Sequence, residues 1–380
     1  MQVLYRRPAQ RLLWGDDTIV RLPGELARAG AQRPLILCGG SVGRHPRLIP
    51  RLADVLEALV GGISTEVRSH SPLSRVEVVV DALRRTRADS IVAVGGGSAF
   101  VTARAASILH GESRPLQSLA TRYAADGTAI SVRLDAPKLP IIAVPTTPTT
   151  AASKAGTAVT VPGSGARLTM FDPQTRARSI LLDPEYLSSS PPTLTLQASL
   201  NAFVMAVEGL CSARSHLFSD AVLTHAIRQL ADLLPTLAGE TATPHRRMQA
   251  ALVSILVGEG TDAAGGGLTA ALSHTLGHQL GVHNGLADAA LLPYVLEHVP
   301  PAPSALELVA DALSCATDQV VDRVRELLAA AAAPVRLRDL GLRREGLEDL
   351  AREATQDFAY ARGPDRPAPR TVVDILNAAW

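Results

Sequence analysis

Two short stretches of this 380-residue chain combine residues suited to binding or catalysis. The first is a glycine turn, in which Gly95, Gly96 and Gly97 are followed by Ser98 at the start of an alanine-rich helix. Three glycines remove the Cβ atoms that keep an anion away from the backbone, and the helix start presents free N–H groups and a positive dipole end. The turn predicts a phosphate site, although a tight strand-to-helix turn that needs a positive φ could have the same residues.

The second stretch contains His274, His278 and His283. The first two are four residues apart, so they share a helix face, which is the spacing of a metal pair or a proton relay. Because imidazole titrates near neutral pH, we expect His274 to act as a general acid toward a carbonyl oxygen or to hydrogen-bond a substrate. Packing between helices is the alternative for these residues, and for His278 and His283 we favour a place on the surface or behind the site.

Alternating strands and helices must position the glycine turn. Short apolar runs typical of buried strands occupy residues 33–38, 65–69, 91–94, 139–144 and 180–182, and residues 2–13 alternate like a strand pair. Helical patterns cover residues 18–29, 48–60 and 75–86 between them. This order predicts an α/β domain with a doubly wound parallel sheet, whose ligands lie beyond the carboxyl ends of the strands.

From residue 194 onward, eight segments up to residue 356 show helical periodicity and predict an all-α C-terminal domain. We place the α/β dinucleotide-binding domain at residues 1–187 and the helical domain at residues 188–380. The proline-rich segment 111–140 has no clear period and is expected to be an exposed excursion.

The composition is that of an ordinary soluble globular protein, with 47% hydrophobic and 19% charged residues. A net charge of +1 provides no basic stripe for nucleic acid, and no apolar run is long enough to span a bilayer. The N-terminus does not look like a signal peptide, and the three cysteines lack metal or redox spacing. We therefore expect a cytoplasmic protein that acts on a small molecule, without a nucleic-acid or membrane partner.

The end of the first long strand bears on the choice between NADPH and NADH. An acidic residue at this position would hold the ribose 2′-OH of NAD, but the chain has Gly39, then Gly40 and Ser41. Glycine leaves room for a 2′-phosphate, and Arg44 or Arg47 could pair with it. NADPH is favoured on this reading, whereas NADH remains open if both arginines are only solvated surface residues.

Several ordered motifs resemble the iron-containing alcohol dehydrogenase superfamily, and within it the maleylacetate reductase branch. They are GGGSAFVTARAA from residue 95, AVPTT from 143, LLDP from 181, LNAFVMAVEGL from 200 and GLTAALSHTLGHQLGVHNGLADAALLP from 267. The resemblance covers the whole chain. It implies a dinucleotide-binding domain, a helical domain, an active site in the cleft between them, and a homodimer joined through the N-terminal β segment.

The resemblance also implies roles for particular residues. Gly96, Gly97 and Ser98 would hold the pyrophosphate of the cofactor, and the track from adenine to nicotinamide would be lined by Thr146, Thr147 and Leu181. Two positions depart from the family pattern, since Val101 replaces the usual aspartate and Arg104 the usual lysine. Maleylacetate reductases also lack an acidic residue at the first of these positions, so the cofactor assignment is weakened but stands.

The metal positions of the family depart further. Metal-dependent members have an aspartate and a histidine four residues apart on the first helix of the second domain, and two more histidines farther on. The matching residues here are Asn201, Met205, Ala270 and Asn284. They offer no anionic or imidazole donor, so we expect no bound iron or zinc. Maleylacetate reductase is itself regarded as metal-independent, and Asn201 agrees with its pattern, but the other three positions lack the histidines of that branch.

These four residues, with Phe203, are predicted to line the substrate cleft. The apolar side chains of Met205 and Phe203 favour a bulky, apolar substrate, unless Met205 only fills the space that a metal would occupy.

Two functions are compatible with these residues. The first is a metal-independent NAD(P)H-dependent reductase that acts on a carbonyl or an enone, for which secondary metabolism is one setting. The second is a non-redox step, such as a dehydration, cyclisation or lyase reaction, in the same cleft. The glycine turn and the Thr146-Thr147 strand end favour the reductase, and we adopt it; Gly39, Val101 and the lost metal ligands favour the alternative.

Overall fold

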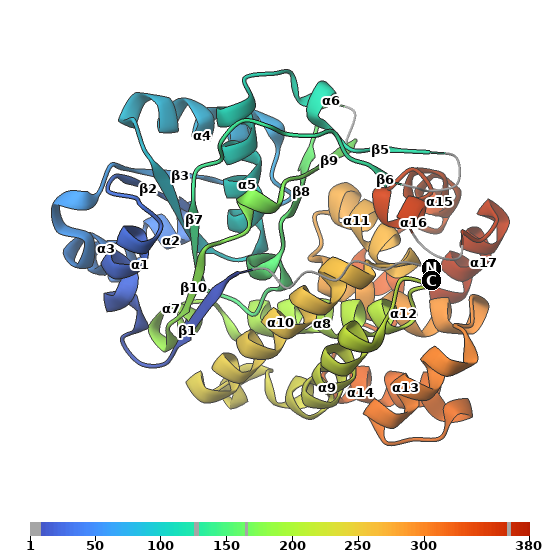
Figure 1. Cartoon of the computed structure of the whole chain (residues 1–380). Helices are drawn as coiled ribbons and strands as arrows, with labels where there is room; N and C mark the ends of the chain where they lie inside the picture. Colours follow the sequence, from blue (N-terminus) through green and yellow to red (C-terminus); the bar gives the residue numbers. More distant parts are fainter. Residues whose placement is uncertain (1–8, 125–128, 164–165, 363–365) are drawn as a thin grey trace. The chain divides into compact units, whose positions relative to one another are not determined.

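The computed structural model describes residues 9–124, 129–163, 166–362 and 366–380. Two compact units divide the chain: one comprises Met1–Arg122 and Ile130–Ser190, and the other Tyr123–Ala129 and Pro191–Trp380. The first unit is built around a parallel sheet and the second is built from helices (Figure 1). The predicted fold class, a parallel α/β half followed by an all-α half, is confirmed.

Six parallel strands form the sheet of the first unit, in the spatial order β1, β10, β7, β4, β2, β3. Their bounds are β1 (Arg11–Trp14), β2 (Pro34–Gly39), β3 (Gly62–Val67), β4 (Ser90–Gly95), β7 (Ile141–Pro145) and β10 (Ser179–Leu182). The chain steps outward from β2 to β3 and then returns to β4 on the other side of β2. This reversal creates a topological switch point between β2 and β4, which is where open α/β sheets bind ligands.

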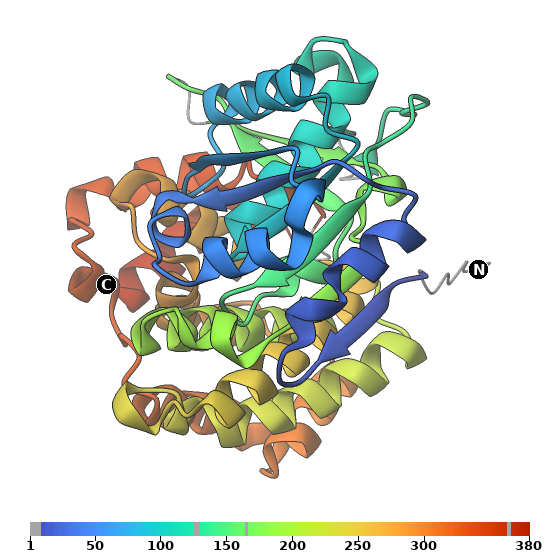
Figure 2. The same ribbon diagram turned by 90° about the vertical axis from the view of Figure 1, so that its left-hand side faces the viewer.

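Helices cover both faces of this sheet, as its continuously apolar strands require. On one face, α1 (Leu22–Arg28) and α3 (Leu48–Leu56) share an apolar core with strand residues such as Ile36, Val92 and Val144 (Figure 2). On the other face, α4 (Leu73–Thr86) and α5 (Gly97–Glu112) pack against the sheet. Helix α5 is the one that begins at the glycine turn.

The second unit consists of helices around the almost completely buried α8. Its helices are α8 (Pro192–Leu210), α9 (Leu217–Leu233), α10 (Pro244–Ala264), α11 (Leu268–Leu280), α12 (Asn284–His298), α13 (Pro303–Leu313), α14 (Val320–Ala330), α15 (Leu347–Ala354), α16 (Phe358–Arg362) and α17 (Pro369–Ala379). The sequence predicts the helices up to α15 with ends shifted by a few residues. It does not predict α17, which buries Val372, Ile375, Leu376 and Ala379.

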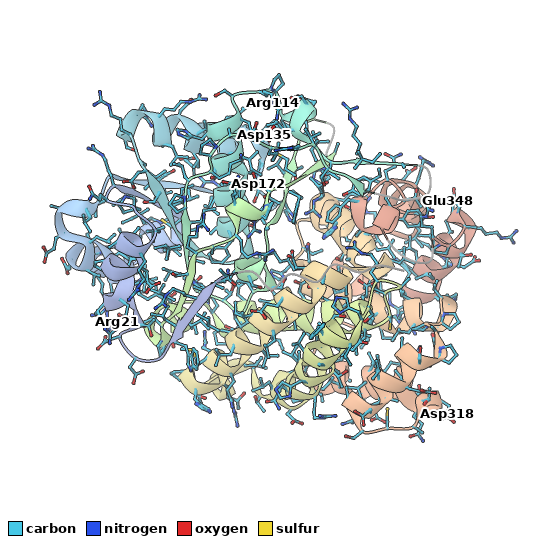
Figure 3. All side chains as sticks on the ribbon, viewed as in Figure 1. Arg21, Arg114, Asp135, Asp172, Asp318 and Glu348 are labelled. Carbon is cyan, nitrogen blue, oxygen red and sulfur yellow. The ribbon has the colours of Figure 1, made fainter. Side chains whose placement is uncertain are left out.

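Two expectations for the first unit are wrong in part. The segment 111–140 is not simply an exposed excursion, because it contains α6 (Leu116–Leu119) and the fully buried side chain of Lys138. Lys138 Nζ pairs with Glu112 at 2.9 Å and with Asp172 at 3.1 Å. Figure 3 labels Asp172 among the side chains of the first unit. The sequence pattern did not predict this cluster, because Lys138, Glu112 and Asp172 are far apart in the sequence.

The other difference concerns the strands at the two ends of the unit. The part of residues 2–13 that the structure describes contains the single strand β1, and residues 1–8 lie outside the described residues. An antiparallel hairpin of β8 (Gly156–Thr160) and β9 (Arg167–Phe171) was not predicted. Within the described residues, no helix is long and apolar enough to cross a membrane.

Candidate functional site

Three neighbouring strands of the first unit end beside one another, and their ends carry most of the predicted cofactor residues. Strand β4 lies between β2 and β7, with Gly95 in register with Pro145. The backbone N–H of Thr146 donates to the carbonyl oxygen of Gly95 over 3.0 Å. The residues that follow β2, β4 and β7 therefore meet at the carboxyl edge of the sheet, beside the switch point.

The glycine turn has the shape of an anion cradle. Gly95 has a φ of +148°, a conformation that side chains rarely adopt. A Cβ on Gly96 would lie 3.0 Å from Thr147 Oγ1, and a Cβ on Gly97 would lie 3.3 Å from Thr149 Oγ1. Gly96 is also the N-cap of α5, so the free N–H groups of a sixteen-residue helix open at this point. The missing side chains leave the backbone at the start of α5 open, and a pyrophosphate at this turn stays a prediction.

Other contacts hold the start of α5 in place. The hydroxyl of Ser71 donates to the carbonyl oxygen of Ser98 over 3.3 Å, and Thr102 Oγ1 donates to Ser71 Oγ over 3.1 Å. Arg104, which stands where the family has lysine, is buried and donates to the carbonyl oxygens of Ala151 and Lys154 at 2.6 and 3.1 Å. The structure gives Arg104 a role in tying α5 to the loop after β7.

The two arginines near the end of β2 have different surroundings. Arg44 folds back over the glycine pair, because a Cβ on Gly40 would lie 3.0 Å from its Nη1 atom. Arg47 instead forms an ion pair of 2.6 Å with Glu185. Of the two, Arg44 is the one that lies beside the predicted 2′-phosphate position, next to Gly39.

Two further predicted cofactor residues differ in exposure. Ser41 is exposed on α2 (Gly40–Gly43), directly after β2. Leu181 is fully buried in β10 and packs in the apolar core of the first unit. Packing is the role that the structure gives Leu181, and its contact with a cofactor stays a prediction.

In the second unit, three helices each present partly exposed residues at predicted site positions. They are Asn201 and Met205 on α8, Ala270 and His274 on α11, and Asn284 on α12. Apart from Leu286, which is also partly exposed, the residues around them on these helices are mostly buried. Phe203 is fully buried in the helical core, so its predicted place in the wall of the substrate site is not where its side chain lies.

Helices α8 and α12 approach each other very closely at Gly285. A Cβ at this residue would lie 1.8 Å from the carbonyl oxygen of Gln197, so only glycine fits. The close approach places Asn201 against Asp288, and the amide Nδ2 lies 2.6 Å from Asp288 Oδ2. The other carboxyl oxygen, Oδ1, is buried without a hydrogen-bond partner.

Asp288 is the main site residue that the sequence analysis missed. Its side chain is buried, with 1% exposed. Burial raises the pKa of Asp288 to about 8. The charge of Glu208 adds to this increase, and hydrogen bonds from Ser273 and Asn201 oppose it. The available signal was a single acidic residue inside the apolar run from Leu286 to Pro293. A carboxyl group in such a place can hold its proton at neutral pH.

His274 is oriented by a second acidic residue that the sequence analysis did not identify. Its Nδ1 atom lies 3.2 Å from both carboxyl oxygens of Asp357, and its ring stacks on Phe358 with centroids 5.3 Å apart. Asp357 is separated from His274 by 83 residues, so sequence spacing could not reveal the pair. A histidine held through Nδ1 can present Nε2 for proton transfer.

The other two histidines are not brought to this pair. His278 is exposed, and His283 is the N-cap of α12, where its Nδ1 accepts from the backbone N–H of Gly285 over 3.1 Å. Capping is the role that the structure gives His283. Among the residues that the structure describes, no group of three or more His, Cys, Asp or Glu side chains is arranged to hold a metal ion.

Glu208 links α8 to the start of α11. Its carboxyl oxygens accept from the backbone N–H groups of Gly267, Thr269 and Ala270 at 3.0, 2.6 and 3.2 Å. Burial raises the pKa of Glu208, and these hydrogen bonds oppose that shift. Its contacts are those of a structural tie between helices.

Comparison with known proteins identifies the family. The model of the iron-containing alcohol dehydrogenase family matches residues 9–184, and the model of the C-terminal part of the Fe-containing alcohol dehydrogenase family matches residues 195–380. The chain belongs to the iron-containing alcohol dehydrogenase family. It is therefore an oxidoreductase by descent, and the resemblance seen in its motifs is confirmed.

Relatives of this family member include reductases of two kinds. It is 28% identical over 348 residues to maleylacetate reductase 1 of Cupriavidus pinatubonensis, covering 91% of this chain and 89% of the relative. It is 24% identical to the lactaldehyde reductase of Escherichia coli, covering 97% of both. The alcohol dehydrogenase of Oenococcus oeni shares the fold, with a TM-score of 0.90, 21% identity and coverage of 99% and 100%.

The iron implied by the family name does not suit the residues at the matching positions. Asn201 is engaged with Asp288, Met205 offers a thioether, and Ala270 offers only a methyl group. Asn284 has a buried amide oxygen without a hydrogen-bond partner. These four side chains include no histidine and no carboxylate, which makes them a poor set of metal ligands, and the expected lack of a bound metal stays a prediction.

Proposed function

We propose that this member of the family is an NAD(P)H-dependent reductase of a carbonyl or enone substrate and that it works without a bound metal. The observation that carries the proposal is the meeting of three strand ends beside Gly96 and Gly97, where the N–H groups at the start of α5 open without side chains to cover them. Ser98, Thr146 and Thr147 lie at the same edge of the sheet and complete the proposed cofactor site.

NADPH is the cofactor that we favour over NADH. The strand β2 ends in Gly39 without a carboxylate to repel a 2′-phosphate, and the guanidinium of Arg44 lies over the adjacent Gly40. Arg47 is a weaker candidate for this contact because it is already paired with Glu185. A planar, permanently charged guanidinium is well suited to phosphate.

His274 is the proposed proton donor. A reduced nicotinamide, when bound, would supply a hydride to the carbonyl carbon. The oxygen then takes a proton from His274 Nε2, and an alcohol results. Asp357 holds Nδ1 of the same ring at 3.2 Å, which fixes the ring for this transfer and stabilises its protonated form.

The substrate class follows from the relatives and from the residues on the helical unit. Relatives named maleylacetate reductase and lactaldehyde reductase act on an enone acid and an aldehyde by name. Met205 and Ala270 replace polar ligands with apolar surface, so we propose a bulkier and more apolar substrate here, in a pathway such as secondary metabolism. We further propose a cytoplasmic homodimer, with the sheet-edge strand β1 at its interface and without nucleic-acid or membrane partners.

The test is a spectrophotometric screen with chelator-treated protein whose metal content has been measured. Carbonyl and enone compounds are offered with NADPH and then with NADH. Cofactor oxidation that is unchanged when Fe²⁺ or Zn²⁺ is added supports the proposal. Activity that appears only with added metal would contradict metal independence, and turnover of a compound without any cofactor would favour the non-redox alternative.

A further inference from the structure

Asn201 and Asp288 form a pair whose chemistry the reductase proposal has not used. Their closest atoms are 2.6 Å apart, and the pair joins α8 to α12 directly beside the tight contact at Gly285. Asp288 is enclosed, whereas Asn201 is partly exposed, as is Met205 four residues later on α8. One member is therefore held inside the helical unit while the other can reach a ligand.

We propose that Asn201 donates a hydrogen bond from its Nδ2 atom to the substrate's carbonyl oxygen, and that Asp288 sets this orientation by donating its carboxyl proton to Asn201 Oδ1. The inference rests on the proposed reductase function. Asn201 is then a catalytic residue that contacts the reacting oxygen, and Asp288 is a positioning residue that acts through Asn201.

The contact between the two side chains is compatible with this exchange of roles. The orientation of an asparagine amide is assigned from its hydrogen bonds, because its oxygen and nitrogen atoms have nearly the same size. The closest atoms of the pair are 2.6 Å apart, which suits a carboxyl O–H donor to an amide oxygen as well as an amide N–H donor to a carboxylate. A protonated Asp288 can therefore face the amide oxygen of Asn201.

The surroundings of Asp288 favour the protonated acid. Burial raises its pKa to about 8, and the nearby charge of Glu208 acts in the same direction. Glu208 comes from α8, and the polar groups that face Asp288 are Ser273 on α11 and Asn201 on α8. The helices α14 and α17 pack against α12 through apolar clusters.

The proposed hydrogen-bond donor would stabilise negative charge on the carbonyl oxygen, which a bound metal ion does in metal-dependent enzymes. Negative charge develops on the carbonyl oxygen as hydride adds to the carbon, and a fixed hydrogen-bond donor in a water-poor site stabilises that charge. Asn201 occupies the position of the first metal ligand in the family, where the surrounding residues do not suit a metal. An oriented amide N–H at Asn201 is a polar donor suited to this role.

The first test replaces Asn201 by aspartate, which has nearly the same shape but no N–H donor. We expect Asn201→Asp to lower kcat about 100-fold, the loss typical of removing one such donor, with unchanged affinity for NADPH. The matched control is Asn377→Asp, because Asn377 is an exposed helical asparagine that donates to Val373. Unchanged kcat in Asn201→Asp would overturn the inference.

The second test separates positioning from packing at Asp288. Asp288→Asn keeps a donor facing Asn201 Oδ1, so kcat should stay near that of the wild type, whereas Asp288→Leu should lower it. The wild-type rate should fall as the pH rises through about 8, because the ionised acid would turn the Asn201 amide round. Asp288→Asn should lose this limb of the pH profile. A limb that persists in Asp288→Asn would contradict the role of Asp288.

A third measurement does not depend on activity. The aspartate ionises at about pH 4 in the unfolded chain, whereas the folded protein keeps its proton up to about pH 8. A raised folded pKa contributes stability that is complete below the unfolded pKa and is lost as the pH rises through the folded pKa. The denaturant midpoint of the wild type should therefore fall, relative to that of Asp288→Asn, as the pH rises from about 4 to about 8. Parallel curves would show an ionised Asp288 and overturn the inference.

Failure of the inference and failure of the proposed function give different results. If the wild type oxidises neither NADPH nor NADH with any carbonyl or enone compound, the reductase proposal fails, and the inference fails with it. If the wild type is active but Asn201→Asp matches it, only the inference is wrong.

Discussion

His274 is held between Asp357 and Phe358, and this limits what its ring can do. Two carboxyl oxygens at 3.2 Å engage Nδ1, and the stacked phenyl ring restricts rotation. A proton transfer role for His274 therefore has to use Nε2. A role in helix packing alone would not require a carboxylate partner aligned with one ring nitrogen.

Replacing His274 by glutamine should lower kcat about 100-fold with little change in KM, because general acid catalysis is lost while binding remains. Steady-state kinetics with the preferred cofactor is the measurement. His278→Gln is the matched control, since His278 is exposed on the same helix. Equal loss in both variants, or none in His274→Gln, would mean that His274 does not donate the proton.

The buried charge of Lys138 has a structural role. Its ammonium group is fully enclosed between Glu112 and Asp172, near the start of β7. Burial alone would raise the pKa of Glu112. Hydrogen bonds from Lys138 and Arg114 outweigh this effect, so the pKa of Glu112 is lowered overall. The cluster ties the end of α5 to the loop after β9.

Lys138→Met should reduce the free energy of unfolding by about 3–5 kcal/mol, because it leaves the buried carboxylate of Asp172 without its cation and Glu112 with Arg114 as its remaining cation. Urea denaturation at neutral pH measures the loss. For comparison, Arg133→Met removes an exposed ion pair with Asp135 and should cost at most about 1 kcal/mol. A similar small cost for Lys138→Met would show that the cluster contributes nothing.

Helix α5 connects the glycine turn to the rest of the first unit, and its first residues determine whether an anion can approach. Gly97 is the first residue of the helix and has an ordinary backbone conformation, so a substitution there changes the cradle rather than the fold. A valine would project toward Thr149 and Ala151.

Gly97→Val should weaken NADPH binding at least tenfold by occupying the phosphate position, and Ser98→Ala should weaken it less. Calorimetric titration measures both, and thermal melting should show that both variants remain folded. If Gly97→Val binds NADPH as tightly as the wild type does, the cofactor does not bind at this turn.

The start of α11 depends on a side chain from α8. Glu208→Ala leaves three N–H groups without their acceptor, two of them on buried residues, so it should cost about 1–3 kcal/mol for each group left unsatisfied. Denaturant unfolding measures this loss, and Glu208→Gln, which keeps one carbonyl acceptor, should recover part of it. If Glu208→Ala is as stable as the wild type, the capping role is wrong.

Helices and strands with strong periodicity could be predicted from the sequence. The buried strand β4 and the helix α5 after the glycine turn follow from a local apolar run and a local breaker. The sequence analysis missed the hairpin β8–β9, and it missed the helix α17 although α17 begins at a proline and has its buried residues at helical spacing. In the site, the cradle is local and was predicted, whereas Asp288 and Asp357 act through contacts with residues 87 and 83 positions away.

The molecule as a whole has a parallel sheet whose strand ends carry the proposed cofactor site, and a helical unit that carries the proposed substrate residues. Membership of the iron-containing alcohol dehydrogenase family accounts for the fold, but function depends on the residues in the site. In the first unit the glycine turn opens the start of α5, and in the second the amide of Asn201 is paired with the buried Asp288.

Cofactor binding without metal is the central claim, and one titration tests it most directly. Chelator-treated protein of measured metal content is titrated calorimetrically with NADPH and then with NADH. The account predicts micromolar binding of at least one of them, tighter for NADPH, and a marked loss in Gly97→Val. Absence of binding by both cofactors, or binding that requires added Fe²⁺ or Zn²⁺, would contradict it.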